Sequence, residues 1–280
     1  MAVHHWIRWR TQYPRDSKLR RLQGKSGRAN QFTTRAQKAV AIMLKSKRGI
    51  SRAGPTLACK SVQDWLLPRC NGYHGMHVSR TPTWGDVQHH VDALASYGLL
   101  GLEETAHEDV QVAGNEDQSV EANLSNSAQR LVAPLLQLGM PDKFIQQIQA
   151  DFQEVGGIVA KMMPTAEKLI LKLEIMGEGI CSRWHRDNYA ARAIITYNGR
   201  GTEMLRHDDV DFWELDNCGN NLHIVRDGAQ IFSVGAGDVL FMKGLTFPGN
   251  VNGLVHKSPD KRYHRDGNLM NRLVLKVDVP

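Results

Sequence analysis

The chain has 280 residues, enough for one large domain or for one domain with an appended segment. Its hydrophobic content of 41% and charged content of 23% are ordinary for a soluble globular protein with a buried core. No stretch approaches the roughly 18 apolar residues of a membrane span, and the N-terminus lacks the apolar run of a secretory signal. Four scattered cysteines without a C-x-x-C pair argue against a disulfide framework or a zinc site, and favour an intracellular, reducing compartment.

The net charge of +6 hides a strong asymmetry. Residues 1–60 hold 15 Lys or Arg and a single acidic residue, Asp16, so the remaining 220 residues, with 20 basic and 28 acidic side chains, are acidic overall. Segments this basic occur as disordered arms, organelle transit peptides and nucleic-acid-binding tails. We predict a flexible basic arm or targeting segment. The location is then cytoplasmic, or mitochondrial or plastid if the arm is a transit peptide. Nucleic-acid binding is less favoured, because no zinc finger or RNP motif accompanies the charge.

Residues 61–165 are predicted to be mainly helical and to support the domain that follows. Apolar residues at three- and four-residue spacing indicate helices over Asp86–Leu99 and Ser127–Leu138, with a polar loop over Glu103–Asn126 between them. The strongest helical pattern runs from Pro141 to Met163, and its apolar stripe is typical of a helix packed on a barrel.

From Glu167 onward the pattern changes to short strands separated by Gly-rich turns, which indicates a sandwich or a barrel such as the jelly roll. The predicted strands are Lys168–Met176, Ala191–Tyr197, Leu222–Arg226, Gln230–Val234, Asp238–Lys243, Gly253–His256 and Arg272–Val279. The predicted fold class is therefore α+β, with a double-stranded β-helix (a cupin-like jelly roll) over residues 166–280 and supporting helices before it.

The candidate site lies in Cys181-Ser-Arg-Trp-His185-Arg-Asp187, which follows the first of these strands. Residues i and i+2 of a strand project from the same face, so His185 and Asp187 should point together into the interior, and Trp184 and Arg186 away from it. A third candidate, His256, lies 71 positions after His185. Two His and one carboxylate leave open positions on a metal, as in non-haem Fe(II) oxygenases. We predict that these three residues bind Fe(II) and form the catalytic site.

An oxygenase that uses 2-oxoglutarate also needs a cation for the far carboxylate of this co-substrate. Arg272 opens the last strand, and a guanidinium can meet a carboxylate through two parallel hydrogen bonds. It is therefore the first candidate, although a solvent-facing charge at a strand end is the alternative. Lys243 is a further candidate. Thr202 and Glu203, on the turn after the Ala191–Tyr197 strand, could contact the metal-holding residues or the substrate.

Other motifs are weaker candidates. His264-Arg-Asp266 repeats the H-x-D pattern but lies in a polar loop with no strand leading into it, and His207-Asp-Asp209 also has the composition of a loop. His89 and His90 are adjacent in sequence, so on a helix they face different directions. Cys181 is expected to be a small buried thiol rather than a nucleophile.

Five blocks of sequence, in order, resemble the family catalogued as domain of unknown function 1826. They are Cys181-x-x-x-His185-x-Asp187, Thr196-Tyr-Asn-Gly-Arg-Gly-Thr-Glu203, Gly237-Asp-Val-Leu-Phe-Met-Lys-Gly244, Gly253-Leu-Val-His-Lys-Ser-Pro259 and Arg272-Leu-Val-Leu. The resemblance covers roughly residues 120–280. The motifs of that family look like those of 2-oxoglutarate/Fe(II) oxygenase barrels, so the resemblance implies this fold and these site residues.

The expected function is thus that of a non-haem Fe(II)- and 2-oxoglutarate-dependent oxygenase, which would oxidise a C–H bond of a small-molecule or protein substrate. A cupin-like metal- or ligand-binding protein without redox turnover is the alternative. A third possibility is an interaction module in which the basic arm contacts nucleic acid and the barrel is structural.

Overall fold

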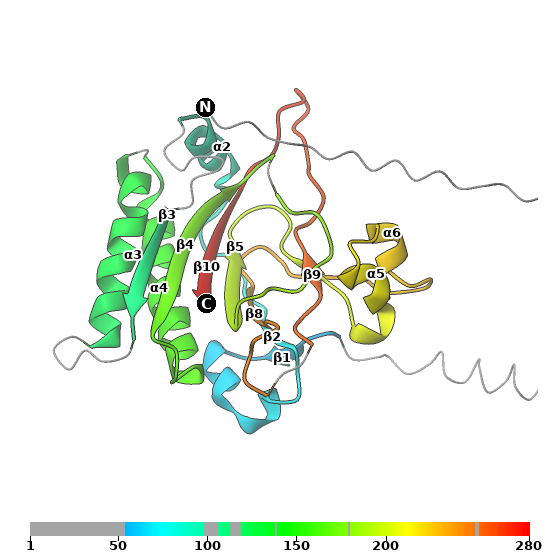
Figure 1. Cartoon of the computed structure of the whole chain (residues 1–280). Coiled ribbons are helices and arrows are strands. Elements are labelled where there is room, and N and C mark those ends of the chain that lie inside the picture. The colour runs from blue at the N-terminus through cyan, green and yellow to red at the C-terminus, as the bar shows by residue number, and fades with distance from the viewer. Residues whose placement is uncertain (1–53, 98–105, 113–118, 138, 179, 250–251) are drawn as a thin grey trace, which may run out of the picture. The chain divides into compact units, whose positions relative to one another are not determined.

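Two β-sheets organise the computed structural model, which describes residues 54–97, 106–112, 119–137, 139–178, 180–249 and 252–280 (Figure 1). These residues belong to one unit, Ala53–Pro280, and the predicted basic arm lies, up to residue 53, outside them. None of the helices described is long and apolar enough to cross a membrane.

The larger sheet has seven strands and is antiparallel except for its first pair. In order across the sheet they are β1 (Leu57–Cys59), β2 (Gly75–Val78), β8 (Val239–Lys243), β5 (Ala191–Thr196), β10 (Arg272–Val279), β4 (Lys168–Met176) and β3 (Ala106–Gln111). The four central strands β8, β5, β10 and β4 match predicted strands to within one residue at each end. They could be predicted because at least every second side chain in each of them is buried.

The smaller sheet has the order β7 (Phe232–Ser233), β6 (Glu203–Met204) and β9 (His256–Lys257). A single antiparallel bridge between His185 and His256 joins the segment before Asp187 to the free side of β9. The smaller sheet therefore carries both predicted His ligands.

Alternation along the strands gives the large sheet two different faces. Leu273, Leu275 and Val277 of β10 belong to the main hydrophobic core, together with apolar residues of β4 and β5. The residues between them, Val274, Lys276 and Asp278, share the opposite face with Arg272. A separate apolar cluster joins that opposite face to the smaller sheet through Leu240 and Met242 of β8, packed with Met204, Val234 and Leu254.

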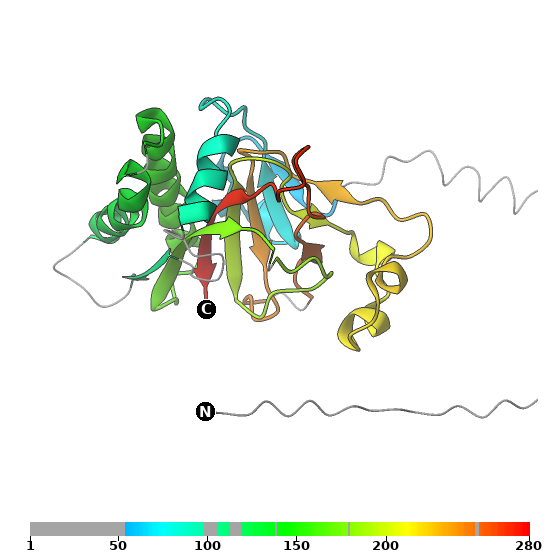
Figure 2. The ribbon, with the colours of Figure 1, turned by 90° about the horizontal axis from the view of Figure 1, so that it is seen from above.

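Helices cover the core-forming side of the large sheet. The long ones are α2 (Gln88–Tyr97), α3 (Val120–Gln137) and α4 (Asp142–Met162); α3 and α4 pack on each other and on the β3 and β4 side of the sheet (Figures 1 and 2). The apolar stripe predicted for α4 is confirmed, since Phe144, Ile148, Phe152, Val155 and Val159 are all fully buried. The short helices are η2 (Val62–Leu66), η3 (Pro68–Cys70), η4 (His207–Asp209), α5 (Phe212–Asp216) and α6 (Asn221–Ile224).

Several segments differ from the sequence prediction. The strand β1 lies inside the predicted arm, and β2 and β3 lie inside the segment 61–165 predicted to be mainly helical. The segment Leu222–Arg226, predicted to be a strand, instead begins within α6, because the Asn220 side chain accepts a hydrogen bond from the Leu222 N–H and caps this short helix.

Candidate metal centre

The backbone places His185 and His256 side by side. The His185 N–H donates to the His256 carbonyl over 3.0 Å, and the His256 N–H donates to the His185 carbonyl over 3.0 Å. Directly opposed residues of an antiparallel pair project from the same face, and the two ring centroids are accordingly 4.4 Å apart. The neighbouring Trp184 points the other way, into an apolar cluster with Leu205 and Val255 on the outer side of the smaller sheet, as predicted.

Backbone carbonyls fix the orientation of both imidazoles and the position of the Nδ1 hydrogen. Nδ1 of His185 lies 2.8 Å from the Arg183 carbonyl, and Nδ1 of His256 lies 2.9 Å from the Leu254 carbonyl. A carbonyl can only accept, so each Nδ1 carries a hydrogen, and in the neutral form of either ring the lone pair lies on Nε2. Burial lowers the pKa of His256 to about 4, and nearby His185 and Arg192 act in the same direction against the opposing effect of Asp187. The His256 ring is therefore neutral at physiological pH, which is the form that binds metals.

Asp187 completes a three-residue cluster with these rings. Its Oδ1 lies 3.7 Å from Nε2 of His185 and its Oδ2 lies 3.6 Å from Nε2 of His256. All three potential ligand atoms lie within 4.8 Å of one another. The buried Oδ2 accepts no hydrogen bond from the described residues, although Nη1 of Arg192 lies 3.0 Å from it, so its lone pairs are available to a metal cation. Two imidazoles and one carboxylate oxygen suit a borderline divalent ion, so the residues present fit the predicted Fe(II).

An arginine that the sequence analysis did not single out contacts this cluster. Arg192 on β5 donates from Nη1 to Oδ1 of Asp187 over 3.1 Å. Its Nε and Nη2 donate to the two oxygens of Asp278 on β10 over 2.5 and 3.0 Å. Asp278 is also 2.9 Å from Nζ of Lys172 on β4. The only signal in the sequence is that Arg192 and Asp278 are charged residues inside mostly apolar strands.

Charge pairing holds this network together. Burial opposes the charge of Arg192, but its hydrogen bonds to Asp278 and the nearby Asp187 carboxylate raise its pKa still further above the ordinary value. Burial alone would raise the pKa of Asp278, whereas Arg192 and Lys172 lower it. Both side chains are therefore ionised. Arg192, Asp278 and Lys172 form a charged row on one face of the large sheet, and Asp187 lies at its end in contact with Arg192.

Arg272 lies on the same face of β10 as Asp278 but at the other end of the strand. Its Nη1 donates to the Arg200 carbonyl over 2.9 Å, whereas its buried Nη2 has no partner in the part of the chain that the structure describes. Burial lowers the pKa of Arg272 to about 10, and only Glu203 opposes this effect. The guanidinium lines a pocket with Met176 and Gly199. The structure records no contact between Arg272 and the three clustered residues, and its binding of a co-substrate stays a prediction.

The position of Lys243 does not support the predicted co-substrate role. Lys243 is paired with Ala191 at the end of β8, so it lies on the opposite face of the sheet from Arg192. Its Nζ donates to the carbonyls of Cys70 and Asn71 over 3.1 and 3.0 Å. Lys243 thus ties the segment around η3 to the sheet.

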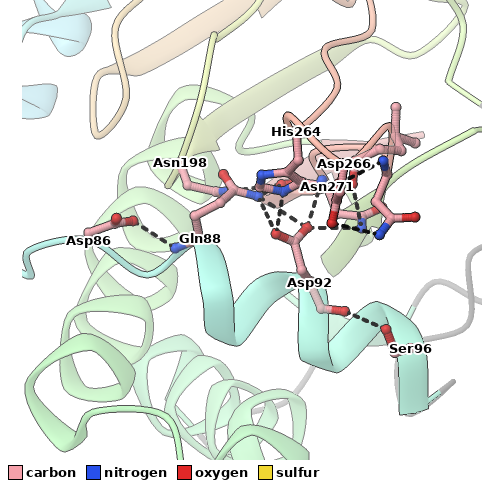
Figure 3. A network of polar contacts seen from close by, with 10 residues as sticks. Asp86, Gln88, Asp92, Ser96, Asn198, His264, Asp266 and Asn271 are labelled. Atoms are coloured by element: carbon pink, nitrogen blue, oxygen red, sulfur yellow. Dashed lines mark hydrogen bonds and ion pairs between the residues drawn. The ribbon is translucent and has the colours of Figure 1, made fainter.

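The weaker candidates of the sequence analysis lie apart from the cluster. Nε2 of His264 lies 2.9 Å from Asp92 in a polar network that joins the loop before β10 to α2 (Figure 3). His207 stacks on His74 with ring centroids 3.8 Å apart. Glu203 pairs with Lys257 over 2.8 Å. Cys181 is exposed, against the expectation of a buried thiol.

Comparison with protein families gives one match, and it covers most of the chain. A family model described as "Protein of unknown function (DUF1826)" matches residues 97–278, beginning earlier than the resemblance noted from the motifs. A search of curated proteins finds no significant match.

Solved structures of oxygenases are remotely similar to the chain. The dioxygenase for auxin oxidation 1 from Arabidopsis thaliana, solved with 2-oxoglutarate, is 11% identical, with a TM-score of 0.43 over 81% of this chain and 92% of that one. The dioxygenase for auxin oxidation of rice is 11% identical, with a TM-score of 0.39 over 81% of this chain and 83% of that one. A Pseudomonas putida prolyl-4-hydroxylase is 13% identical, with a TM-score of 0.29 over 71% of this chain and 97% of that one.

Proposed function

The chain belongs to the DUF1826 family, and we propose that it is a non-haem Fe(II)- and 2-oxoglutarate-dependent oxygenase. The observation that carries the proposal is the cluster of His185, Asp187 and His256, in which two Nε2 atoms and a carboxylate oxygen that accepts no hydrogen bond face each other. Three protein ligands on one side of an Fe(II) ion leave the opposite side open, which is the arrangement that oxygen-activating iron enzymes use.

The connectivity of the strands supports a double-stranded β-helix. After β4 of the large sheet, the chain bridges to the smaller sheet at His185 and returns as β5. It then crosses to β6 and β7, returns as β8, crosses to β9 and ends as β10. A chain that alternates between two facing sheets in this way is typical of a jelly roll, in which the space between the sheets can hold a ligand.

Each residue of the site has a role in this proposal. His185, His256 and Asp187 would hold Fe(II), which when bound supplies the electrons that activate O2 for oxidation of a C–H bond. The two backbone carbonyls that accept from Nδ1 would hold both rings with Nε2 aimed at the ion. Arg272, with its unpartnered Nη2, would pair with the far carboxylate of 2-oxoglutarate.

The test is the visible absorbance of the protein with Fe(II) under anaerobic conditions, before and after 2-oxoglutarate is added. Chelation of the keto acid by the bound iron should give a weak charge-transfer band, which His185→Ala or Asp187→Ala should abolish. Arg272→Met should raise the 2-oxoglutarate concentration needed for half of the band by at least about tenfold, equivalent to 1.4 kcal/mol, without changing Fe(II) affinity. His264→Ala is the matched control for Fe(II) binding alone, because this histidine belongs to a second H-x-D motif outside the cluster.

Two outcomes would contradict the proposal in different ways. Undiminished metal binding by His185→Ala would show that the ligands are elsewhere. Iron binding by the wild type without a keto-acid band would favour a cupin-like metal-binding protein that has no redox turnover.

A further inference from the structure

The two oxygens of Asp187 have different surroundings. Nη1 of Arg192 lies 3.1 Å from Oδ1, to which it donates a hydrogen bond. The same nitrogen lies 3.0 Å from Oδ2, but the hydrogen bond runs to Oδ1 alone, and Oδ2 has no partner within the described residues. Arg192 therefore holds Oδ1 through a directed hydrogen bond, whereas Oδ2 meets the same guanidinium through charge alone and keeps its lone pairs for a metal cation.

Arg192 has little freedom to leave this position. Its other two nitrogens are held by both oxygens of Asp278, which is fully buried, and the Arg192 side chain itself is only 11% exposed. Asp278 stands directly opposite Arg192 in the β5–β10 pairing, so the register of the sheet sets the place of the guanidinium. The planar guanidinium of an arginine can donate hydrogen bonds to two carboxylates in this way, whereas the single ammonium group of a lysine cannot bind both in the same geometry.

We infer that Arg192 is a positioning residue that restricts Asp187 to a single metal-binding oxygen. This inference rests on the proposed metal centre. A carboxylate can bind a metal through one oxygen or through both. With Oδ1 held by Arg192, Asp187 would occupy one coordination position of the metal ion. Three positions of the ion would then stay open for a bidentate ligand and O2. Without Arg192, Asp187 is free to bind through both oxygens, and a positive charge next to the metal is removed.

The inference predicts an unusual direction of change. Replacing Arg192 with Met should tighten the binding of a divalent cation, whereas the loss of a residue that only supports the fold would weaken it. The same replacement should reduce the response of the bound cation to a keto acid, because Asp187 then fills an additional position.

The experiment uses Co(II), whose visible spectrum reports coordination, titrated into the full chain. Arg192→Met and Arg192→Gln should bind Co(II) at least about tenfold more tightly than the wild type, a difference of 1.4 kcal/mol, with a changed spectrum. Addition of 2-oxoglutarate should then perturb their spectra less. Arg192→Lys keeps the positive charge but cannot bridge Asp187 and Asp278, so it should bring the affinity back toward the wild-type value while keeping the changed spectrum. Lys172→Met is the matched control, because it removes the other cation that contacts Asp278 and leaves the Arg192–Asp187 contact in place.

Unchanged or weakened Co(II) binding in folded Arg192→Met and Arg192→Gln proteins would overturn the inference. Equal tightening in Lys172→Met would also overturn it, since the effect would then be one of general charge. A wild-type protein that binds Co(II) but does not respond to 2-oxoglutarate would contradict the oxygenase proposal alone, and the affinities of the variants would still decide the role of Arg192. A wild type that does not bind Co(II) would contradict both.

Discussion

Asp151 of α4 is a carboxylate buried against the core-forming side of the sheet. Arg80 contacts both of its oxygens at 2.6 and 3.1 Å, Gln147 donates over 2.9 Å, and the hydroxyl of Tyr197 on the strand side donates over 2.9 Å. Burial raises the pKa of Tyr197 well above its ordinary value, and the negative charge of Asp151 adds to this effect. The phenol therefore stays protonated and acts as a donor that joins the sheet to α4.

Removing this hydroxyl should cost stability without disturbing the metal centre. Tyr197→Phe is expected to lower the free energy of unfolding by about 1.5–3 kcal/mol, the usual contribution of a hydrogen bond to a charged group. Chemical denaturation would measure the loss. Tyr263→Phe is the control, because Tyr263 is 55% exposed and its hydroxyl should contribute little. Equal stability of the two variants would show that the Tyr197–Asp151 bond is not made in solution.

Asp238 should make stability depend on pH. Burial alone would raise the pKa of Asp238, but the N–H groups of Arg80 and Gly235 and the His77 ring lower it below the ordinary 3.8. The folded state then holds fewer protons than the unfolded state in acid, so this contribution is complete above about pH 4 and is lost as the pH falls further. Asp238→Asn should be less stable than the wild type at pH 7, and the difference should shrink toward pH 3 in urea titrations. A difference that does not change with pH would contradict the assignment.

At the scale of elements, Asp92 ties α2 to the loop that leads into β10 (Figure 3). Its Oδ1 accepts from the backbone N–H and the side-chain amide of Asn271 over 3.0 and 3.1 Å, and its Oδ2 accepts from Gln88 over 3.1 Å and contacts His264 at 2.9 Å. Asn271 immediately precedes Arg272. The network therefore fixes the start of the strand that carries the proposed co-substrate contact.

Asp92→Ala should both destabilise the protein and loosen this strand end. Several buried donors lose their acceptor at once, so we expect a loss of about 1–3 kcal/mol in the free energy of unfolding. Hydrogen exchange of the Asn271 amide should accelerate more than exchange in β4. Asp86→Ala removes a single contact, with the Gln88 N–H, and serves as the control. Exchange that is unchanged at Asn271 would show that the loop is held by other contacts.

The elements that could be predicted from the sequence are those whose burial leaves a periodic pattern. α4 and the four central strands have such a pattern, because one of their faces or both are closed off from water. β3 is an edge strand with Val110 buried between the exposed Asp109 and Gln111, so its composition resembles that of a loop. α6 has only four residues, and its character depends on the cap from Asn220 rather than on any periodicity.

At the scale of the whole molecule, the family match does not coincide with the folded unit. The match begins at residue 97, whereas β2 pairs with β8 and buries Met76 and Val78. Trp65 also packs on Phe241 of β8, with ring centroids 5.3 Å apart. The sheet is therefore completed by residues outside the family match.

Truncation should reveal this dependence. A chain of residues 54–280 should unfold cooperatively, whereas residues 97–280 should aggregate, because the edge of β8 and the ring of Phe241 would be exposed. Size-exclusion chromatography and thermal unfolding of the two chains would compare them. A monomeric, cooperatively folded 97–280 chain would show that β1 and β2 are dispensable.

Some residues of the candidate site lie in one short sequence motif, whereas others are brought together only by the pairing of distant strands. His185 and Asp187 share one short motif, and His256 follows a recognisable hydrophobic stretch, so all three could be proposed from the sequence. Arg192 and Asp278 are 86 positions apart, and only the register between β5 and β10 brings them together. The register between two strands cannot be predicted from the residue pattern of either strand alone. The contact of Arg192 with Asp187 could therefore not be predicted.

The reciprocal peptide hydrogen bonds between His185 and His256 have a consequence for the evolution of such a sequence. The distance between these two residues is set across the sheets and not by the number of residues along the chain between them. Insertions and deletions in the exposed turn after α6, at residues 226–228, would therefore lengthen or shorten the path without moving either imidazole. Relatives can be expected to differ most in length there, and two histidines far apart in an alignment can still be neighbours in space.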